Sequence, residues 1–151
     1  MKWKEKRGTF CFGDFTERKR FWPWVRKSWG SRLIHLCEGG APLRGGIALR
    51  GGICGALTGG IVLLGTLLGK DEPEKKDDPT MGKACNEFYK RFENEVAGNY
   101  GSVNCCDIAR VDWRDPEQVK AFREGEGRIQ CVNNTGKAAR ILGEILEKYV
   151  M

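Results

Sequence analysis

The chain has 151 residues with a formal net charge of +6, and 40% of its residues are hydrophobic while 30% are charged. This length supports one ordinary domain with a hydrophobic core and is too short for two. The composition is that of a globular protein, which excludes wholesale disorder and a collagen-like repeat.

The N-terminal third differs from the remainder in charge and aromatic content. Residues 1–50 carry 12 basic and 4 acidic side chains, and four of the five tryptophans lie there. We therefore expect an atypical basic, Trp-rich segment over residues 1–45 and a separate domain over residues 46–151. The run KRFWPWVRKSWG could bind single-stranded nucleic acid or an anionic membrane surface. Because Pro23 interrupts any amphipathic helix there, we expect no nucleic-acid partner.

The seven cysteines and the single histidine restrict the chemistry. The N-terminus MKWKEKRGTF lacks an apolar run followed by a small-residue cleavage site. An odd cysteine count without a secretory signal predicts a reducing, cytoplasmic setting, where cysteines bind metals, carry redox chemistry or are buried. His35 alone excludes a Cys2His2 zinc site, and we interpret it as a surface residue.

Residues 53–69 form the most apolar stretch of the chain. Its 17 residues match the short limit of a membrane span, about 17–25 residues. Its glycines suit close contact between helices, and two amphipathic segments follow that need an apolar surface to cover. We therefore expect a buried central helix and no membrane partner. No Gly-Lys-Ser/Thr sequence ends the glycine-rich run, which argues against a nucleotide site.

The remaining segments predict further helices. The charged residues 71–80 contain two prolines and indicate an exposed linker. A helix then follows to about Tyr100, ending near Gly98 or Gly101, with one apolar face comprising Cys85, Phe88, Phe92 and Val96.

The C-terminal part contains a strong helix start. Asp115, Pro116 and Gln118 match a capping carboxylate, a proline at the first helical position and a capping-box partner. That helix, PEQVKAFRE, ends at Gly125, and a final helix covers about residues 133–149. Its apolar stripe comprises Ala138, Ile141, Leu142, Ile145, Leu146 and Tyr149. The fold class is therefore all-α, a small helical bundle around a buried glycine-rich helix.

Three cysteines share a position near an expected helix start. Cys54 lies in the first turn of the apolar helix, Cys105 opens the short segment DIARV, and Cys131 immediately precedes the final helix. The partial positive charge of a helix N-terminus lowers a thiol pKa and makes an accessible cysteine reactive. The alternative is that each is a small buried hydrophobic residue, which is our interpretation of Cys85.

The same residues form a recognisable ordered pattern. Cys54 begins CGALTG after GGIALRGG, Cys105 follows Gly101-Ser102-Val103-Asn104, and VDWRDPE, Phe122 and Cys131 complete the order. Residues 46–151 thus resemble the C_GCAxxG_C_C family of redox-active proteins. The resemblance implies that Cys54, Cys105 and Cys131 are the last three of four characteristic cysteines. No CxxCH is present, so covalent haem is not expected.

The first family cysteine has no clear counterpart in this chain. Family members place it in an Asn-Cys-Ala-like setting on an apolar helix, whereas Cys11 and Cys37 lie in other contexts. We hypothesise that residues 9–44 are translated in the wrong frame. One base earlier, the codons for Phe21-Trp22-Pro23-Trp24-Val25 give Leu, Ala, then Leu, Met or Val, then Gly, which resembles the missing helix.

The sequence therefore predicts a redox-type cysteine protein whose three thiols converge in a helical bundle. Cys54, Cys105 and Cys131 would act as catalytic thiols in disulfide exchange or, alternatively, as metal ligands for an iron–sulfur cluster or zinc. Neither a fourth ligand nor the redox partner is identified. The competing interpretations are a non-catalytic remnant and the basic-aromatic binding module described above.

Overall fold

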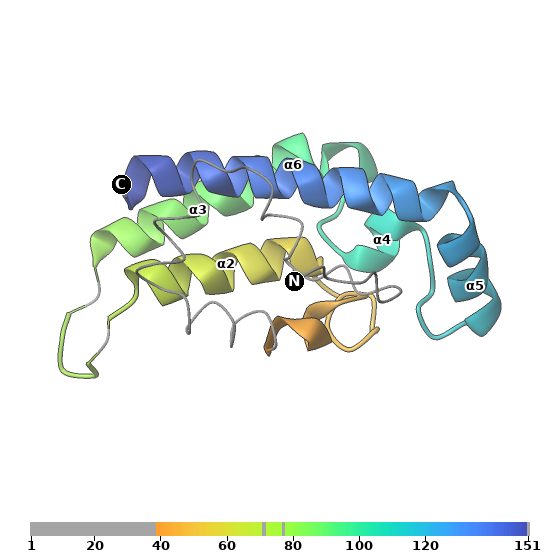
Figure 1. Ribbon diagram of the computed structural model, residues 1–151, viewed down its shortest axis with the longest axis horizontal. Coiled ribbons are helices and arrows are strands. Elements are labelled where there is room, and N and C mark those ends of the chain that lie inside the picture. The colour runs from red at the N-terminus through yellow and green to blue at the C-terminus, as the bar shows by residue number, and fades with distance from the viewer. Residues whose placement is uncertain (1–38, 71, 77, 151) are drawn as a thin grey trace, which may run out of the picture. The chain divides into compact units, whose positions relative to one another are not determined.

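The structure is a computed structural model that describes residues 39–70, 72–76 and 78–150 (Figure 1). The chain divides into two compact units, residues 1–41 and 42–151, and the helical bundle belongs to the second. The tryptophans of the basic segment, His35 and most of the proposed out-of-frame segment 9–44 lie outside the described residues.

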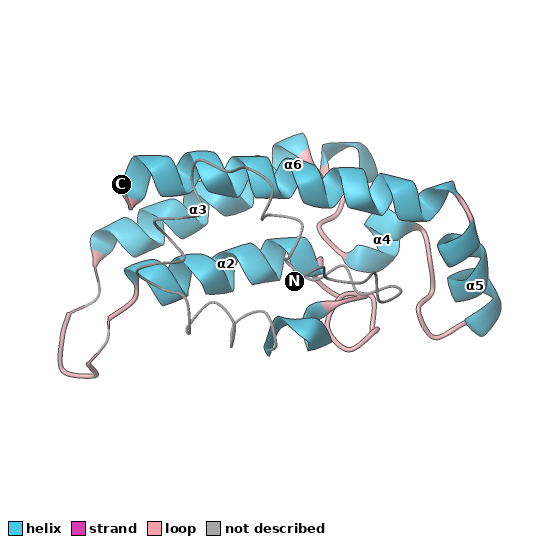
Figure 2. Ribbon diagram, viewed as in Figure 1, coloured by secondary structure: helices cyan, strands magenta, loops and turns pink. Residues whose placement is uncertain are grey.

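Helices account for the regular structure of the described residues (Figure 2), and one isolated antiparallel bridge joins Ile53 to Asn104. The predicted all-α class is confirmed. No helix in the described ranges is long and apolar enough to cross a membrane. The elements are η2 (Ala41–Leu43), α2 (Gly55–Leu68), α3 (Pro79–Glu95), η3 (Gly98–Tyr100), α4 (Cys105–Ala109), α5 (Pro116–Glu124) and α6 (Glu126–Tyr149).

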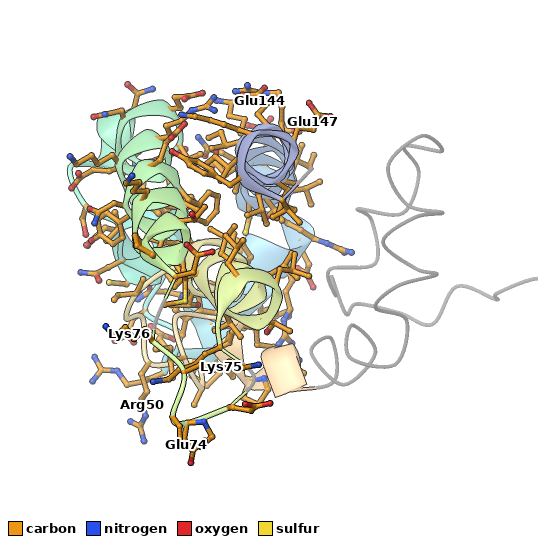
Figure 3. All side chains as sticks on the ribbon, turned by 90° about the vertical axis from the view of Figure 1, so that its left-hand side faces the viewer. Arg50, Glu74, Lys75, Lys76, Glu144 and Glu147 are labelled. Carbon is orange, nitrogen blue, oxygen red and sulfur yellow. The ribbon has the colours of Figure 1, made fainter. Side chains whose placement is uncertain are left out.

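Helices α2, α3 and α6 pack against one another in pairs and form the bundle. Viewed along their length, they lie at the corners of a triangle (Figure 3). The short helices α4 and α5 contact α6 near the end of the bundle where α2 begins (Figure 1). Both loops that lead into α2 and α4 therefore lie at this end.

The bundle interior is filled by large apolar side chains. Those with almost no exposed surface are Leu57, Leu64, Phe88, Phe92, Ile141, Leu142, Ile145 and Leu146. Burying each one stabilises the fold by about 1.5–3 kcal/mol relative to leaving it exposed. The core confirms the predicted apolar faces of α3 and α6 except at Cys85 and Tyr149, which are only half-buried.

The glycine-rich helix α2 approaches α3 closely and is buried on one side. A Cβ atom at Gly60 would collide with the ring of Phe88, so only glycine allows this contact. Leu57, Leu63 and Leu64 are buried on the same helix, whereas Val62 remains 46% exposed. The burial of α2 is thus one-sided.

Capping carboxylates fix the starts of α3 and α5. Asp78 accepts a hydrogen bond from the Thr80 N–H at 2.7 Å, and Asp115 accepts one from the Glu117 N–H at 2.9 Å. The predicted range and cap of α5 are confirmed. The side-chain amide of Gln118 donates to Asp115 Oδ2 at 2.9 Å, which differs from the backbone contact of a capping box.

Four charged side chains connect α3 and α6. Arg91 pairs with Glu95 at 2.6 Å and with Glu144 at 2.7 Å, while Arg140 pairs with the same two carboxylates at 2.9 and 2.7 Å. Figure 3 shows Glu144 at the outer edge of the bundle. These partly exposed pairs contribute little individually but hold the two helices in one register.

Helix α6 starts at Glu126, seven residues before the predicted start at 133. The prediction was wrong because residues 126–132 lack the apolar stripe that identified the rest of the helix. The Tyr100 hydroxyl accepts hydrogen bonds from Gln130 (2.7 Å) and from Asn134, about one turn further along the helix (3.1 Å). These bonds tie this part of α6 to η3. Cys131 consequently lies inside the helix.

Candidate functional site: a cluster of cysteine thiols

The loop before α2 pairs with the loop before α4. Ile53 and Asn104 form an antiparallel bridge, and backbone hydrogen bonds continue on both sides of it. These are Cys54 N–H to Val103 O at 2.9 Å, Cys105 N–H to Gly52 O at 2.7 Å and Cys106 N–H to Gly51 O at 3.1 Å. The pairing brings Cys54 and Cys105 together although 50 residues separate them in the sequence.

Gly51 is required at this junction for two reasons. Its φ of +76° lies in the left-handed region, where a side chain is strained, and a Cβ there would lie 2.9 Å from the Cβ of Cys106. Any other residue would therefore strain the backbone and push the two loops apart.

A left-handed turn precedes the paired segment. Ile47, Ala48 and Leu49 have φ values of 59°, 53° and 58°. The turn is closed by hydrogen bonds from the Gly51 N–H to Gly45 O at 2.9 Å and from the Gly52 N–H to Gly46 O at 3.0 Å. A left-handed conformation costs about 1–2 kcal/mol for each residue other than glycine. The surrounding hydrogen bonds therefore stabilise a backbone conformation that these residues otherwise disfavour.

Helix α6 adds the third thiol to the cluster. Burial raises the pKa of Cys105 to about 12, and the nearby Cys54 and Cys131 thiols contribute to that increase. The Cys54 thiol also helps to raise the pKa of Cys131. Each of the three sulfurs is thus within electrostatic reach of the other two. We call Cys54, Cys105 and Cys131 the thiol cluster.

The expected lowering of these pKa values is wrong, because burial outweighs the helix N-termini. Cys54 caps α2, and the backbone N–H groups of Ala56 and Leu57 favour its thiolate, yet burial raises its pKa overall. The pKa of Cys131 is also raised by burial, against the contribution of the Thr135 hydroxyl. Cys131 was predicted to precede α6 but lies inside it. Its thiol therefore does not have the lowered pKa that the partial positive charge of a helix N-terminus would cause.

Trp113 provides an unpaired donor beside the cluster. Its indole N–H is buried and has no hydrogen-bond partner in the described part of the chain. The same N–H lies close enough to Cys105 to lower the thiol pKa, although burial dominates. A thiolate at Cys105 would give this donor an acceptor. The ring packs edge-on against Phe122, with centroids 5.1 Å apart, which fixes its orientation.

The two other described cysteines lie outside the cluster. Cys85 is half-buried on α3, and its thiol pKa is raised by burial alone. Cys106 is also half-buried, and its thiol donates to Asp107 Oδ1 at 3.6 Å. Burial and the Asp107 carboxylate together raise the pKa of Cys106.

A pocket of about 320 Å³ opens next to Cys106. Its lining residues are Arg50, Gly51, Cys106, Arg110, Val111, Asp112, Trp113, Arg114 and Gln118. No sequence pattern indicated this pocket, because Arg50 precedes α2 whereas Arg110 and Arg114 lie between α4 and α5, and they form no local motif. Trp113 appeared in the sequence only as part of the VDWRDPE element.

The described residues do not form a ready metal site. No group of three or more His, Cys, Asp or Glu side chains within residues 39–70, 72–76 and 78–150 is arranged to hold a metal ion. As they lie in the structure, the thiols of Cys54, Cys105 and Cys131 therefore do not fit zinc or an iron–sulfur cluster by themselves.

Comparison with known proteins identifies the family. Residues 32–145 match the model of the family described as "Putative redox-active protein (C_GCAxxG_C_C)". A search of curated proteins and a search of solved structures each gave no significant match. The matched range contains the whole thiol cluster and begins before residue 46, where the sequence resemblance started. The chain belongs to this C_GCAxxG_C_C family.

Proposed function

We propose that the protein carries out thiol–disulfide exchange through Cys54, Cys105 and Cys131. The observation that supports this proposal is the backbone pairing of the loops before α2 and α4, which brings Cys54 and Cys105 together. In addition, Cys54 and Cys131 help to raise the pKa of Cys105, and Cys54 helps to raise that of Cys131. Thiols that are neighbours in the folded state can form a disulfide without large rearrangement of the backbone. The paired loops before α2 and α4 supply the rigid support for such chemistry.

The exchange converts two protein thiols and a partner disulfide into one protein disulfide and two partner thiols. A cluster thiolate attacks the partner, one partner sulfur leaves as a thiolate, and a second cluster thiol then displaces the other partner sulfur. Two electrons and two protons pass to the partner. The indole N–H of Trp113 favours the thiolate of Cys105 during these steps.

Exchange is favoured over metal ligation by the arrangement of the donors. The described residues lack a group of three side chains arranged around a metal ion, and disulfide formation needs only two sulfurs. Ligation by Cys54, Cys105 and Cys131 remains the second candidate function, because the same thiolates are the ligands that zinc and iron–sulfur clusters use.

Differential alkylation of the full chain tests the proposal. Trypsin places the cluster in separate peptides, residues 51–70 for Cys54, 92–110 for Cys105 and 129–137 for Cys131. Using the Cys106→Ser variant leaves Cys105 as the single thiol of its peptide. After equilibration in a glutathione redox buffer, we expect a disulfide-linked pair among these three peptides, found by mass spectrometry.

Cys85 is the matched control, because it is half-buried on α3 and lies outside the cluster. Its peptide, residues 84–90, should remain unlinked under the same conditions. Three free cluster thiols across the whole range of redox buffers would overturn exchange. Stoichiometric zinc or iron in anaerobically purified protein, lost in a Cys105→Ser variant, would instead support ligation.

The domain division belongs to the same proposal. We infer that residues 46–151 form the helical redox domain and that its setting is the cytoplasm. Out-of-frame translation of residues 9–44 remains part of this proposal. The nucleotide sequence tests this directly, since an upstream frame that encodes no apolar helix with a cysteine would exclude it.

A further inference from the structure

The pocket beside Cys106 carries an excess of positive charge. Arg50, Arg110 and Arg114 line it, and Asp112 is its one acidic lining residue. Asp112 is already paired, because the guanidinium of Arg114 donates to both of its carboxylate oxygens at 2.9 and 3.0 Å. The lining therefore has a net charge of +2, which favours an anionic ligand.

Two of these arginines are available to a ligand. Within the described residues, neither Arg50 nor Arg110 forms an ion pair or a side-chain hydrogen bond. Figure 3 shows the side chain of Arg50 pointing outward from its loop. Planar guanidinium groups bind carboxylates through two parallel hydrogen bonds, so the pocket suits a ligand that carries carboxylates.

A thiol lies in the same pocket and next to the thiol cluster. Cys106 lines the pocket directly, and its position is fixed by the hydrogen bond from its N–H to Gly51 O at 3.1 Å. It follows Cys105 in the chain, and Trp113 contacts both the pocket and the cluster. A ligand held by the arginines would thus lie beside a sulfur that neighbours the proposed exchange site.

We propose that this pocket binds a small carboxylate-bearing disulfide and that Cys106 forms the first mixed disulfide with it. The proposal rests on the proposed thiol exchange, for which it supplies the substrate class and the entry point. The Cys106 thiol loses its proton to solvent, and its thiolate attacks one sulfur of the ligand. The ligand S–S bond breaks, a Cys106–ligand S–S bond forms, and the other half leaves as a thiolate that takes up a proton.

The test compares three disulfide probes on the full chain. Oxidised glutathione is anionic, 2-hydroxyethyl disulfide is neutral and cystamine is cationic. Initial rates of modification at Cys106 are measured by fragmentation of the peptide 92–110 and divided by the rates in urea-unfolded protein. We expect oxidised glutathione to react faster than cystamine after this correction, and added salt to reduce the difference.

A double variant separates the pocket from general charge effects. Arg50→Gln with Arg110→Asn removes the two unpaired cations, and asparagine tolerates the left-handed φ of 54° at position 110. We expect the rate with oxidised glutathione to fall about three- to tenfold, as for the loss of two exposed charge contacts. The matched control is Arg123→Gln with Arg128→Gln, two exposed residues outside the pocket, which should leave the rate unchanged.

Equal corrected rates with the anionic and cationic probes would overturn the proposal, and so would equal losses in the two double variants. Circular dichroism of each variant confirms that the helices are retained. This result is separable from the proposed function, because the cluster disulfide is measured at equilibrium, which does not depend on the entry point, whereas the charge preference is an initial rate at Cys106. A cluster disulfide without charge preference at Cys106 would retain exchange and reject this pocket as its entry point.

Discussion

The two ends of the helical domain are stabilised in different ways. Around Phe88 and Phe92, three long helices bury apolar side chains, and the charged network of α3 and α6 covers their outer edge. At the cysteine end, short loops are held by backbone hydrogen bonds across the Ile53–Asn104 bridge, beside a left-handed turn.

This difference shows how a small protein can hold loops of particular backbone conformation on a packed helical base. The packed end derives its stability from burial, which depends on side-chain volume and tolerates similar replacements. The cysteine end depends on particular backbone conformations. Whether a substitution is tolerated there is therefore decided by the φ angle of the residue and by its close contacts. The following substitutions test the comparison, starting with the largest expected effect.

Phe88→Ala should have the largest effect, because it empties the centre of the packed end. The side chain is fully buried and contacts α2 at Gly60. We expect a loss of about 3–5 kcal/mol in the free energy of unfolding, measured by urea denaturation. The neighbouring Tyr89 is 37% exposed, so Tyr89→Ala should cost much less. Similar losses for the two variants would contradict the assigned core.

Gly51→Ala should be the most damaging single change at the cysteine end. The left-handed φ and the contact with Cys106 predict a loss of about 1–3 kcal/mol. Gly82→Ala is the control, because a Cβ there meets nothing within 4 Å inside α3, and it should raise the stability by about 0.5–1 kcal/mol. Urea unfolding curves measure both. An unchanged midpoint for Gly51→Ala would show that the paired loops are not rigid.

Alkaline pH should lower the stability of the protein through ionisation of the Cys105 thiol. Its folded pKa of about 12 lies above the ordinary thiol value, so the folded state favours the protonated thiol. The resulting stabilisation is complete below the unfolded pKa and is lost as the pH rises through the folded value. Between about pH 8.5 and 12, the wild-type melting temperature should therefore fall more steeply than that of Cys105→Ala. Parallel curves would refute the burial of this thiol.

The charged network should give the smallest effect. Arg91 pairs with Glu95 and Glu144, but these side chains are 27%, 35% and 45% exposed, so solvent screens the pairs. We expect Arg91→Gln to lower the free energy of unfolding by about 0.5–1 kcal/mol in low salt and less in high salt. Lys90→Gln removes the same charge from an exposed neighbour and should be neutral. A salt-independent loss would assign the effect to packing.

The sequence predicted the helices better than the paired loops of the cysteine end. Asp115 and Pro116 define the start of α5, and the apolar stripe of α6 is explicit from Ala138 onward. These features are local, so a single sequence contains them. The early start of α6 was missed because its first two turns are stabilised by contacts such as Gln130 with Tyr100, which are distant in the chain.

The cysteine end depends on contacts that no local pattern contains. The order of the motifs predicted Cys54, Cys105 and Cys131 as the site residues, whereas the approach of Cys54 to Cys105 comes from a bridge between two loops. The sign of the pKa changes was mistaken for the same reason, since burial is a property of the assembled fold. The arginine pocket likewise exists only after Arg50 and Arg110 come together.

The left-handed turn before α2 has a consequence for chirality. Ile47, Ala48 and Leu49 adopt φ values that mirror-image amino acids prefer. A semisynthetic chain with D-alanine at position 48 should therefore unfold at a higher temperature than the all-L protein, by the relief of about 1 kcal/mol of torsional strain. At this one bend, the L configuration of the residues opposes the backbone shape that the neighbouring hydrogen bonds maintain.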